Sequence, residues 1–287
     1  MEIFAFLVDG LLIGFVYGIA AMGLTLIWGV MNVINLSHGP IIALGMFGVY
    51  LIFSNFGLNP YLALALVALA GLLFGMLIYG VAISRVINAP HLSSLLATFA
   101  VNMIIIGLGT AAFSTTPRNV DMATLGLGNL SAGVVTVQWT RIIAAAGAIL
   151  TTGALYLFLY RTRQGRYIRA VANNRSAAEL MGVPSTRILA LSFGIGTMLA
   201  AVSGGLIATF FPFTILSGGT YELKSFVIGV LGGLGNPVGA LAGGLVLGTL
   251  EGMIPRFTDT AWVPVIEFVL FVIILLVRPQ GLFGAKK

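Results

Sequence analysis

Eight long apolar runs constrain this chain more than any other feature. They lie at about residues 6–30, 38–53, 60–83, 91–113, 138–160, 187–211, 235–254 and 261–277. Most have the length that a helix needs to cross a bilayer, roughly 17–25 residues. Only 8% of the residues are charged, whereas a soluble domain carries about 25%. We therefore expect an all-α polytopic integral membrane protein whose residues 1–287 form a single transmembrane domain.

A ninth region, residues 213–234, is partly polar and rich in glycine. The sequence predicts a break at Gly218 and Gly219, with Glu222 beside it, and a turn before Pro237 formed by Gly232, Gly233, Gly235 and Asn236. Irregular backbone at membrane depth is tolerated only inside protein or along a wet cavity. We expect this region to cross as a short helix joined to an irregular segment, close to a translocation pathway.

Positive charge is clustered and predicts the orientation. Six of the 14 Lys and Arg residues lie between Arg161 and Arg187, and Arg278, Lys286 and Lys287 close the chain. The positive-inside rule places 161–187 and the tail in the cytoplasm, and 114–137, as a small irregular cap, in the periplasm. This N-out/C-in topology requires 213–234 to cross. A site for anionic lipid or phosphate is the alternative explanation of the charge, and no nucleic-acid partner is expected.

Several kinds of chemistry find no support in the residues. The chain has no cysteine, and its two histidines, His38 and His91, are isolated, so no metal site is expected. There is no G-x-x-x-x-G-K-[ST] phosphate loop, so the chain is not expected to hydrolyse ATP. Its first residues lack the basic region of a cleavable signal peptide, so the first apolar run is expected to remain as a membrane span.

A short polar stretch, RAVANNRSAAELMGVP at residues 169–184, interrupts the apolar chain. Gly165 and Asn173-Asn174 are predicted to break the preceding helix. Ser176 and Glu179 fit a capping box that would start a helix at about 177–181, and Gly182 would end it. Such a helix is too short to be stable alone. It is either a connector or a docking helix for a cytoplasmic partner, and the docking residues would be Arg175, Ser176, Ala177, Ala178, Glu179, Leu180, Met181 and Gly182.

Polar residues within apolar runs are candidates for a pathway or gate. They are Asn32, Asn35, Ser37 and His38, at the expected cytoplasmic junction of the first two spans, and Ser94, Thr98 and Asn102, at helical spacing in the fourth. A polar turn at a helix end and interhelical hydrogen bonds are the alternatives. Glu267 could be a buried structural partner, reach the outer interface or bind a coupled proton. Tyr221, Glu222 and Lys224 could line an outer vestibule or meet a binding protein.

Three stretches resemble one transporter family. They are GLTLIWGVMNVINLSHG at Gly23–Gly39, ANNRSAAELMGVP at 172–184 and GVLGGLGNPVGALAGG at Gly229–Gly244. Together they are similar to the branched-chain amino-acid type of ABC-importer permease, the LivH-like and LivM-like group. The chain length and the outward N-terminus look more like the LivH-like subunit.

The resemblance implies a heteromeric importer in the inner membrane. A LivM-like second permease would complete the pore, two cytoplasmic ATPase subunits would use ATP and Mg, and a periplasmic binding protein would deliver the substrate. The 175–182 helix would transmit ATPase movement to an alternating-access permease. The implied cargo is branched-chain amino acids, with urea, short amides or aromatic acids as alternatives. An ion-coupled transporter is disfavoured, because only Glu267 could serve as its coupling group.

Overall fold

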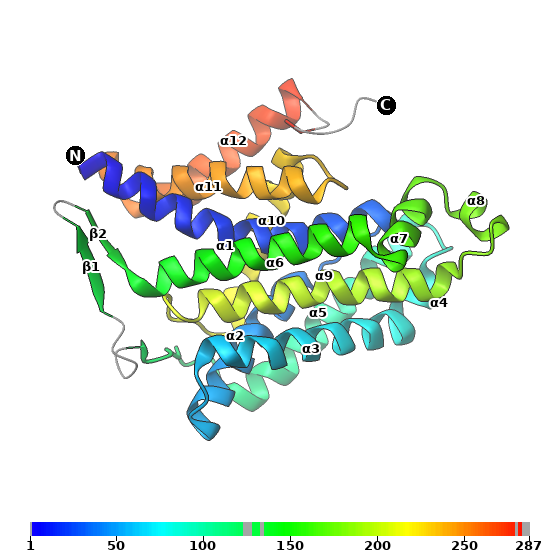
Figure 1. Ribbon diagram of the computed structural model, residues 1–287, viewed down its shortest axis with the longest axis horizontal. Helices are drawn as coiled ribbons and strands as arrows, with labels where there is room; N and C mark the ends of the chain where they lie inside the picture. Colours follow the sequence, from blue (N-terminus) through cyan, green and yellow to red (C-terminus); the bar gives the residue numbers. More distant parts are fainter. Residues whose placement is uncertain (1, 123–127, 133–134, 279–280, 283–287) are drawn as a thin grey trace.

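The computed structural model describes residues 2–122, 128–132, 135–278 and 281–282, which form an almost entirely helical bundle (Figure 1). In chain order the elements are α1 (Glu2–Met31), α2 (His38–Phe56), α3 (Pro60–Ile78), the π-helical turn η1 (Tyr79–Ile83), α4 (Ser84–Val86), α5 (His91–Phe113), the antiparallel strands β1 (Asn129–Ala132) and β2 (Val135–Gln138), α6 (Trp139–Arg161), α7 (Arg163–Asn173), α8 (Arg175–Leu180), α9 (Ser185–Ile207), the 3-10 turn η3 (Ile215–Ser217), α10 (Gly218–Gly232), α11 (Pro237–Phe257), the 3-10 turn η4 (Thr260–Trp262) and α12 (Val263–Val277).

The expected membrane spans are confirmed: the described part of the chain has 8 helices that are long and apolar enough to cross a bilayer. They run between a hairpin end, which carries β1 and β2, and an α8 end opposite it (Figure 1). The N-terminus lies at the hairpin end. Near the C-terminus, the backbone N–H of Leu282 donates to Leu231, which lies at the α8 end of α10. The start of α1 and Leu282 therefore lie at opposite ends of the bundle.

The centre of the bundle is formed by α1 and α9, and small residues allow its helices to approach closely. In the most apolar window of each of these two helices, 83% of the residues are buried. At their crossing, a Cβ added to Gly23 would lie 2.4 Å from the carbonyl oxygen of Gly196. Along α1 and α11, a Cβ on Gly248 would lie 2.3 Å from the Cα of Gly14. Such close approach increases van der Waals packing between the helices, which stabilises their association in lipid, where the hydrophobic effect does not.

Both α1 and α9 are followed by a non-helical stretch that returns to the middle of the bundle. Residues 32–37 bring the Nε2 of His38 to 2.8 Å from the carbonyl oxygen of Ala20, which lies beyond the middle of α1. The stretch after α9 ends at Gly218, where a Cβ would lie 2.3 Å from the carbonyl oxygen of Gly39. Helices α2 and α10 thus begin back to back at mid-depth and run to opposite ends. The α1–α2 and α9–α10 units therefore have an inverted arrangement.

Region 213–234 has the predicted composite form, but the position of its break was wrong. Gly218 and Gly219 are the first residues of α10, and the irregular backbone lies before them, at 208–214. The break falls there because α10 must start against α2, where only glycine leaves room for the backbone contact.

The turn predicted after this helix is present. Helix α10 ends at Gly232, and Gly233 and Gly235 have φ angles of 95° and 87°, which favour glycine. The side chain of Asn236 then accepts the backbone N–H of Gly239 and caps α11, whose first residue is Pro237.

The cap predicted at 114–137 is not wholly irregular, because it contains the β1–β2 hairpin. An antiparallel bridge between Arg118 and Phe213 joins it to the stretch that follows α9. Residues 123–127 and 133–134 of this cap, like Lys286 and Lys287 in the tail, lie outside the described residues.

Candidate functional site

The α8 end presents the polar segment as a short capped helix. The break after α6 falls at Thr162, three residues before the predicted Gly165, and the Thr162 hydroxyl accepts the backbone N–H of Gly165. The next break is at Asn174, as predicted, and its side chain accepts the backbone N–H of Ala177. Gly182 has a φ of 80° and ends the segment in the left-handed conformation, as expected.

The predicted capping box between Ser176 and Glu179 is wrong. Asn174 caps the helix one residue before Arg175, so α8 spans Arg175–Leu180 rather than 177–181. The Glu179 carboxylate instead accepts a hydrogen bond from the hydroxyl of Ser185, at the start of α9. It also forms an ion pair with Arg175, whose Nε lies 3.0 Å from its Oε1. These two donors lower the pKa of Glu179 below its ordinary value. Glu179 therefore ties α8 to α9 rather than closing its own first turn.

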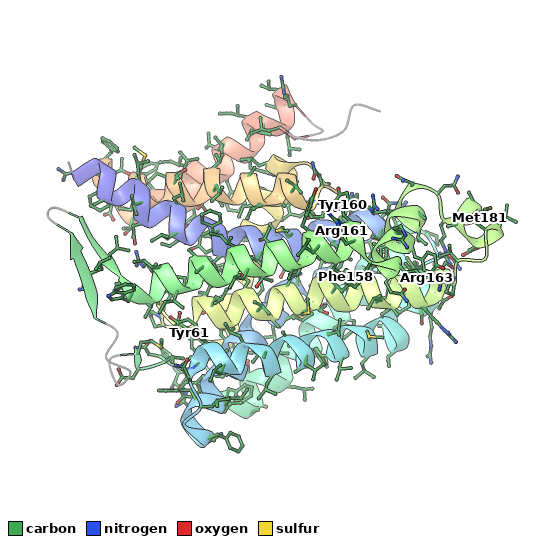
Figure 2. The ribbon with its side chains drawn as sticks, viewed as in Figure 1. Tyr61, Phe158, Tyr160, Arg161, Arg163 and Met181 are labelled. Carbon is green, nitrogen blue, oxygen red and sulfur yellow. The ribbon has the colours of Figure 1, made fainter. Side chains whose placement is uncertain are left out.

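The apolar side chains of this segment point away from the bundle. Leu180 is 89% exposed and Met181 is 85% exposed. Figure 2 shows Met181 at the extreme tip of the α8 end, beyond Arg161 and Arg163. Two large apolar side chains placed beyond the ends of the membrane helices, in a basic region, have no lipid to bury them. This is the surface expected of a docking helix.

Helix α8 also contacts the connection between two earlier helices. The Nη1 of Arg175 donates to the Oδ1 of Asn88 at 3.1 Å. Asn88 belongs to the short connection between α4 and α5. The side chains of Arg175 and Glu179 thus tie α8 to the α4–α5 connection and to the first residue of α9. Sequence reasoning missed the contact between Arg175 and Asn88, because the two residues are far apart in the chain.

The polar residues that follow α1 lie deeper than expected. They were predicted at a cytoplasmic junction. Asn32 is exposed just after the end of α1, but Asn35, Ser37 and His38 lie in the interior and are at most 1% exposed. The Oδ1 of Asn35 accepts both the backbone N–H and the hydroxyl of Ser37. These side chains satisfy the polar groups of backbone that has left the helix at membrane depth.

One face of α5 completes this arrangement. The Thr98 hydroxyl donates to the carbonyl oxygen of Ile34 at 3.0 Å, and the Asn102 amide donates to that of Leu36. Ser94, on the same face, donates to its own helix. A cleft of about 530 Å³ opens beside them and is lined by Trp28, Asn32, Ile34, His91, Leu92, Ser94 and Leu95. Hydrogen bonding to the 32–37 backbone is therefore the observed role of Thr98 and Asn102, while Asn32 and Ser94 line the cleft.

Replacing Asn102 by Leu should destabilise the protein by about 1–3 kcal/mol, because the carbonyl oxygen of Leu36 would lose its donor at membrane depth. The measurement is the thermal unfolding of the detergent-solubilised protein. Ser94→Ala is the matched control on the same helix face, since its hydroxyl bonds only within α5. Equal losses in the two variants would contradict this role of Asn102.

Glu222 lies where the two inverted units meet. It is in the second turn of α10, and its carboxylate accepts a hydrogen bond from the backbone N–H of Gly39 at the start of α2. Its side chain is partly buried, while Gly219 and Thr220 are exposed on the same helix. Glu222 of α10 thus places a carboxylate at the N-terminus of α2, where the helix dipole favours negative charge.

Behind α10, a second charged cluster links four helices. The Nζ of Lys224 lies 2.5 Å from the Oε2 of Glu251 on α11 and 3.5 Å from the Oε1 of Glu267 on α12. On α1, Tyr17 donates to the Oε1 of Glu251 at 3.3 Å, and its ring packs against Tyr221 at 5.9 Å between centroids. Of the roles considered for Glu267, the buried structural partner is the one that this geometry supports.

This cluster changes the assignment of two residues. Lys224 is only 9% exposed and is held in ion pairs, and Tyr221 packs inside against Tyr17. The buried, paired Lys224 does not fit the expectation that it lines an outer vestibule or meets a binding protein. Sequence reasoning also missed Tyr17 and Glu251. A single acidic residue within the apolar run 235–254 was the available signal for Glu251.

Among the residues that the structure describes, no group of three or more His, Cys, Asp or Glu side chains is placed to hold a metal ion.

Comparison with known proteins decides the family. Residues 6–277 match the model of the branched-chain amino acid transport system / permease component family. The chain belongs to this family. It is 31% identical to the high-affinity branched-chain amino acid transport system permease protein LivH of Escherichia coli, over 96% of this chain and 94% of the relative. It is 30% identical to BraD of Pseudomonas aeruginosa, over 97% and 94%.

More distant matches include a permease named for a sugar and a solved ABC transporter. The fructose import permease protein FruG of Bifidobacterium longum is 28% identical over 88% of this chain and 77% of the relative. A solved ABC transporter in an inward-facing conformation aligns with 94% of this chain and 85% of its own, at 14% identity and a TM-score of 0.53. The permease family and the multiple spans identify the chain as a membrane subunit of an ABC transporter, located in the inner membrane.

Proposed function

We propose that this permease forms part of an ATP-driven importer that moves branched-chain or related amino acids from the periplasm to the cytoplasm. The exposed pair Leu180 and Met181 on α8 is the observation that carries the proposal, because it offers a docking surface for a separate ATPase subunit. The amino-acid cargo is supported by LivH and BraD, whose names state branched-chain amino acid transport.

The transport cycle follows from what α8 contacts. An ATPase subunit that binds and hydrolyses ATP with Mg would seat Leu180 and Met181 in a groove. Its closure would displace α8 as a rigid body. Arg175 would carry the displacement to α5 through Asn88, and Glu179 would carry it to α9 through Ser185. The inverted α1–α2 and α9–α10 units would then rock between outward and inward access.

The proposed orientation puts the α8 end in the cytoplasm and the hairpin end in the periplasm. Arg161, Arg163 and the other basic residues of 161–187 cluster at the α8 end (Figure 2), in keeping with the positive-inside rule. A periplasmic binding protein would deliver substrate at the hairpin end. A LivM-like second permease would cover α5 and α12, whose most apolar windows are only 17% and 11% buried.

Changing Leu180 and Met181 together to Ser should abolish ATP-dependent uptake and release the ATPase subunit, because the docking contact loses both apolar side chains. The measurements are uptake of radiolabelled leucine by membrane vesicles and retention of ATPase activity on purification of the complex.

Phe56→Ser is the matched control. Phe56 is 81% exposed but lies at the hairpin end, so its replacement should preserve both readouts. Unchanged ATPase retention in the Leu180/Met181 double variant would overturn the docking assignment. Uptake that persists without ATP would overturn the importer itself.

A further inference from the structure

Glu222 places a carboxyl group at mid-depth with no basic side chain of the described chain paired to it. Within the described ranges, its carboxylate accepts the backbone N–H of Gly39, and the ion pairs of the chain do not include it. Lys224, two residues later, points to the opposite side of α10 and is shared between Glu251 and Glu267. Lys224 is therefore paired with two other carboxylates and does not pair with Glu222.

The surface beside Glu222 is open. A Cβ placed on Gly219, one turn before Glu222, would meet no atom within 4 Å, and Leu216 and Leu223 are each 53% exposed. Helix α5 borders this surface at η3, where a Cβ on Gly109 would lie 2.6 Å from the side chain of Ile215. On the other side, Phe226 packs against Phe271 of α12 at 6.0 Å between ring centroids.

An ionised carboxylate beside lipid at this depth is costly, so a charged Glu222 requires that the open surface face water or protein. The backbone N–H of Gly39 holds one side of the carboxylate in place. The remaining acceptor positions of the carboxylate lack a partner cation in the described chain. This combination of fixed position, low dielectric surroundings and missing counter-charge suits a transient cationic ligand.

We propose that Glu222 is a mid-membrane acceptor site for the ammonium group of the transported solute. The inference rests on the proposed import function and narrows its substrate class. A zwitterionic amino acid carries the required ammonium, whereas fructose, the cargo named for FruG, carries none. The ammonium would form a charge-assisted hydrogen bond with Glu222 as the solute passes the junction of α2 and α10.

The chain has no cysteine, so a single introduced thiol reports on one position. Gly219→Cys places a thiol on the turn next to Glu222, because residues three apart are neighbours on a helix. The full importer, with cysteine-free partner subunits, is treated in membrane vesicles with a trimethylammonium and, separately, a sulfonate methanethiosulfonate reagent. The ratio of the two reaction rates is then compared between Gly219→Cys and Gly219→Cys/Glu222→Gln.

We expect the cation-to-anion rate ratio to fall about tenfold or more when Glu222 becomes Gln, because one nearby charge at an effective dielectric constant of about 20 has at least this effect. Comparing the cation-to-anion rate ratio between the two variants cancels the difference in intrinsic reactivity between the two reagents. Gly153→Cys on α6 is the matched control, since Gly153 is also exposed and open. Facing lipid, it should react with neither reagent.

An unchanged ratio, or no reaction at Gly219→Cys, overturns the site. If Glu222 instead pairs with a cation of a second permease, Glu222→Gln will release that subunit on purification and the ratio will not change, which also overturns the proposal. In the same vesicles, leucine should slow labelling by the cationic reagent, and fructose should not. Absence of ATP-driven leucine uptake by the unmodified importer would count against the proposed function alone, because the reagent ratio tests the site without transport.

Discussion

Replacing Lys224 by Met should destabilise the protein by about 3–5 kcal/mol, because it leaves the carboxylates of Glu251 and Glu267 buried without their shared cation. The side chains are 11%, 21% and 6% exposed, so solvent screens the cluster little. The cluster also joins α12 to α10 and α11, and α12 otherwise leans away from the bundle (Figure 1). The measurement is thermal or denaturant unfolding of the solubilised protein, together with protease accessibility of the C-terminal segment.

Two further variants make this expectation specific. Glu267→Gln keeps the shape and leaves the Lys224–Glu251 pair intact, so its loss should be well below that of Lys224→Met. Adding Glu251→Gln and Glu267→Gln to Lys224→Met removes the uncompensated charge and should restore part of the stability. A Lys224→Met protein as stable as the unmodified one would show that the cluster does not hold these helices together.

Gly248→Ala should destabilise the protein by forcing α11 away from α1. The new Cβ would lie 2.3 Å from the Cα and 2.5 Å from the backbone nitrogen of Gly14. Backbone atoms cannot move aside as a side chain does, so α1 and α11 must separate along their contact. We expect a loss of about 1–3 kcal/mol or more, although Ala by itself favours helix by about 1 kcal/mol.

Gly153→Ala supplies the matched comparison, because Gly153 also lies within a membrane helix but its Cβ would meet no atom within 4 Å. It should leave the melting temperature unchanged or raise it slightly. If both alanine variants unfold at the same temperature, close packing of α1 on α11 does not contribute to stability.

The membrane class, the spans and the family could be read from the sequence because each depends on local pattern. A run of apolar residues as long as the bilayer is thick has few alternatives to a helix. The turn from Gly233 to Pro237 was predicted for the same reason, since positive φ and a fixed proline ring act on the residue itself. The short helix after Asn174 was also found, although its cap was assigned to the wrong residue.

The errors share a physical cause, which is competition between neighbouring groups in space. Ser176 and Glu179 have the spacing of a capping box. In the structure, however, Asn174 accepts the backbone N–H that caps the helix, and the Ser185 hydroxyl donates to the Glu179 carboxylate. Gly218 and Gly219 read as a break because glycine is a poor helix former. In the fold they start a helix, and Gly39 of another unit lies against Gly218.

The inverted arrangement of the two units was also beyond the sequence. The segments Leu11–Val30 and Leu189–Ala208 share Leu, Phe and Gly at matching offsets, which is close to chance among apolar residues. Their relation becomes visible only when Gly23 meets Gly196 and Gly39 meets Gly218. Helix packing depends on shape and small residues, which many unrelated apolar sequences can supply.

The sequence by itself determined that this chain is a helical membrane permease of the branched-chain amino acid family, with a polar helix held out at one end. Hydropathy and local turn chemistry suffice for that, because they act over a few residues. Only the tertiary structure decided which polar groups meet inside the membrane. Lys224 forms ion pairs with Glu251 and Glu267. The Asn102 side chain donates a hydrogen bond to the backbone of 32–37, and the Glu222 carboxylate accepts one from the N–H of Gly39. In a medium without water, the partners of a charge depend on which distant helices lie beside it.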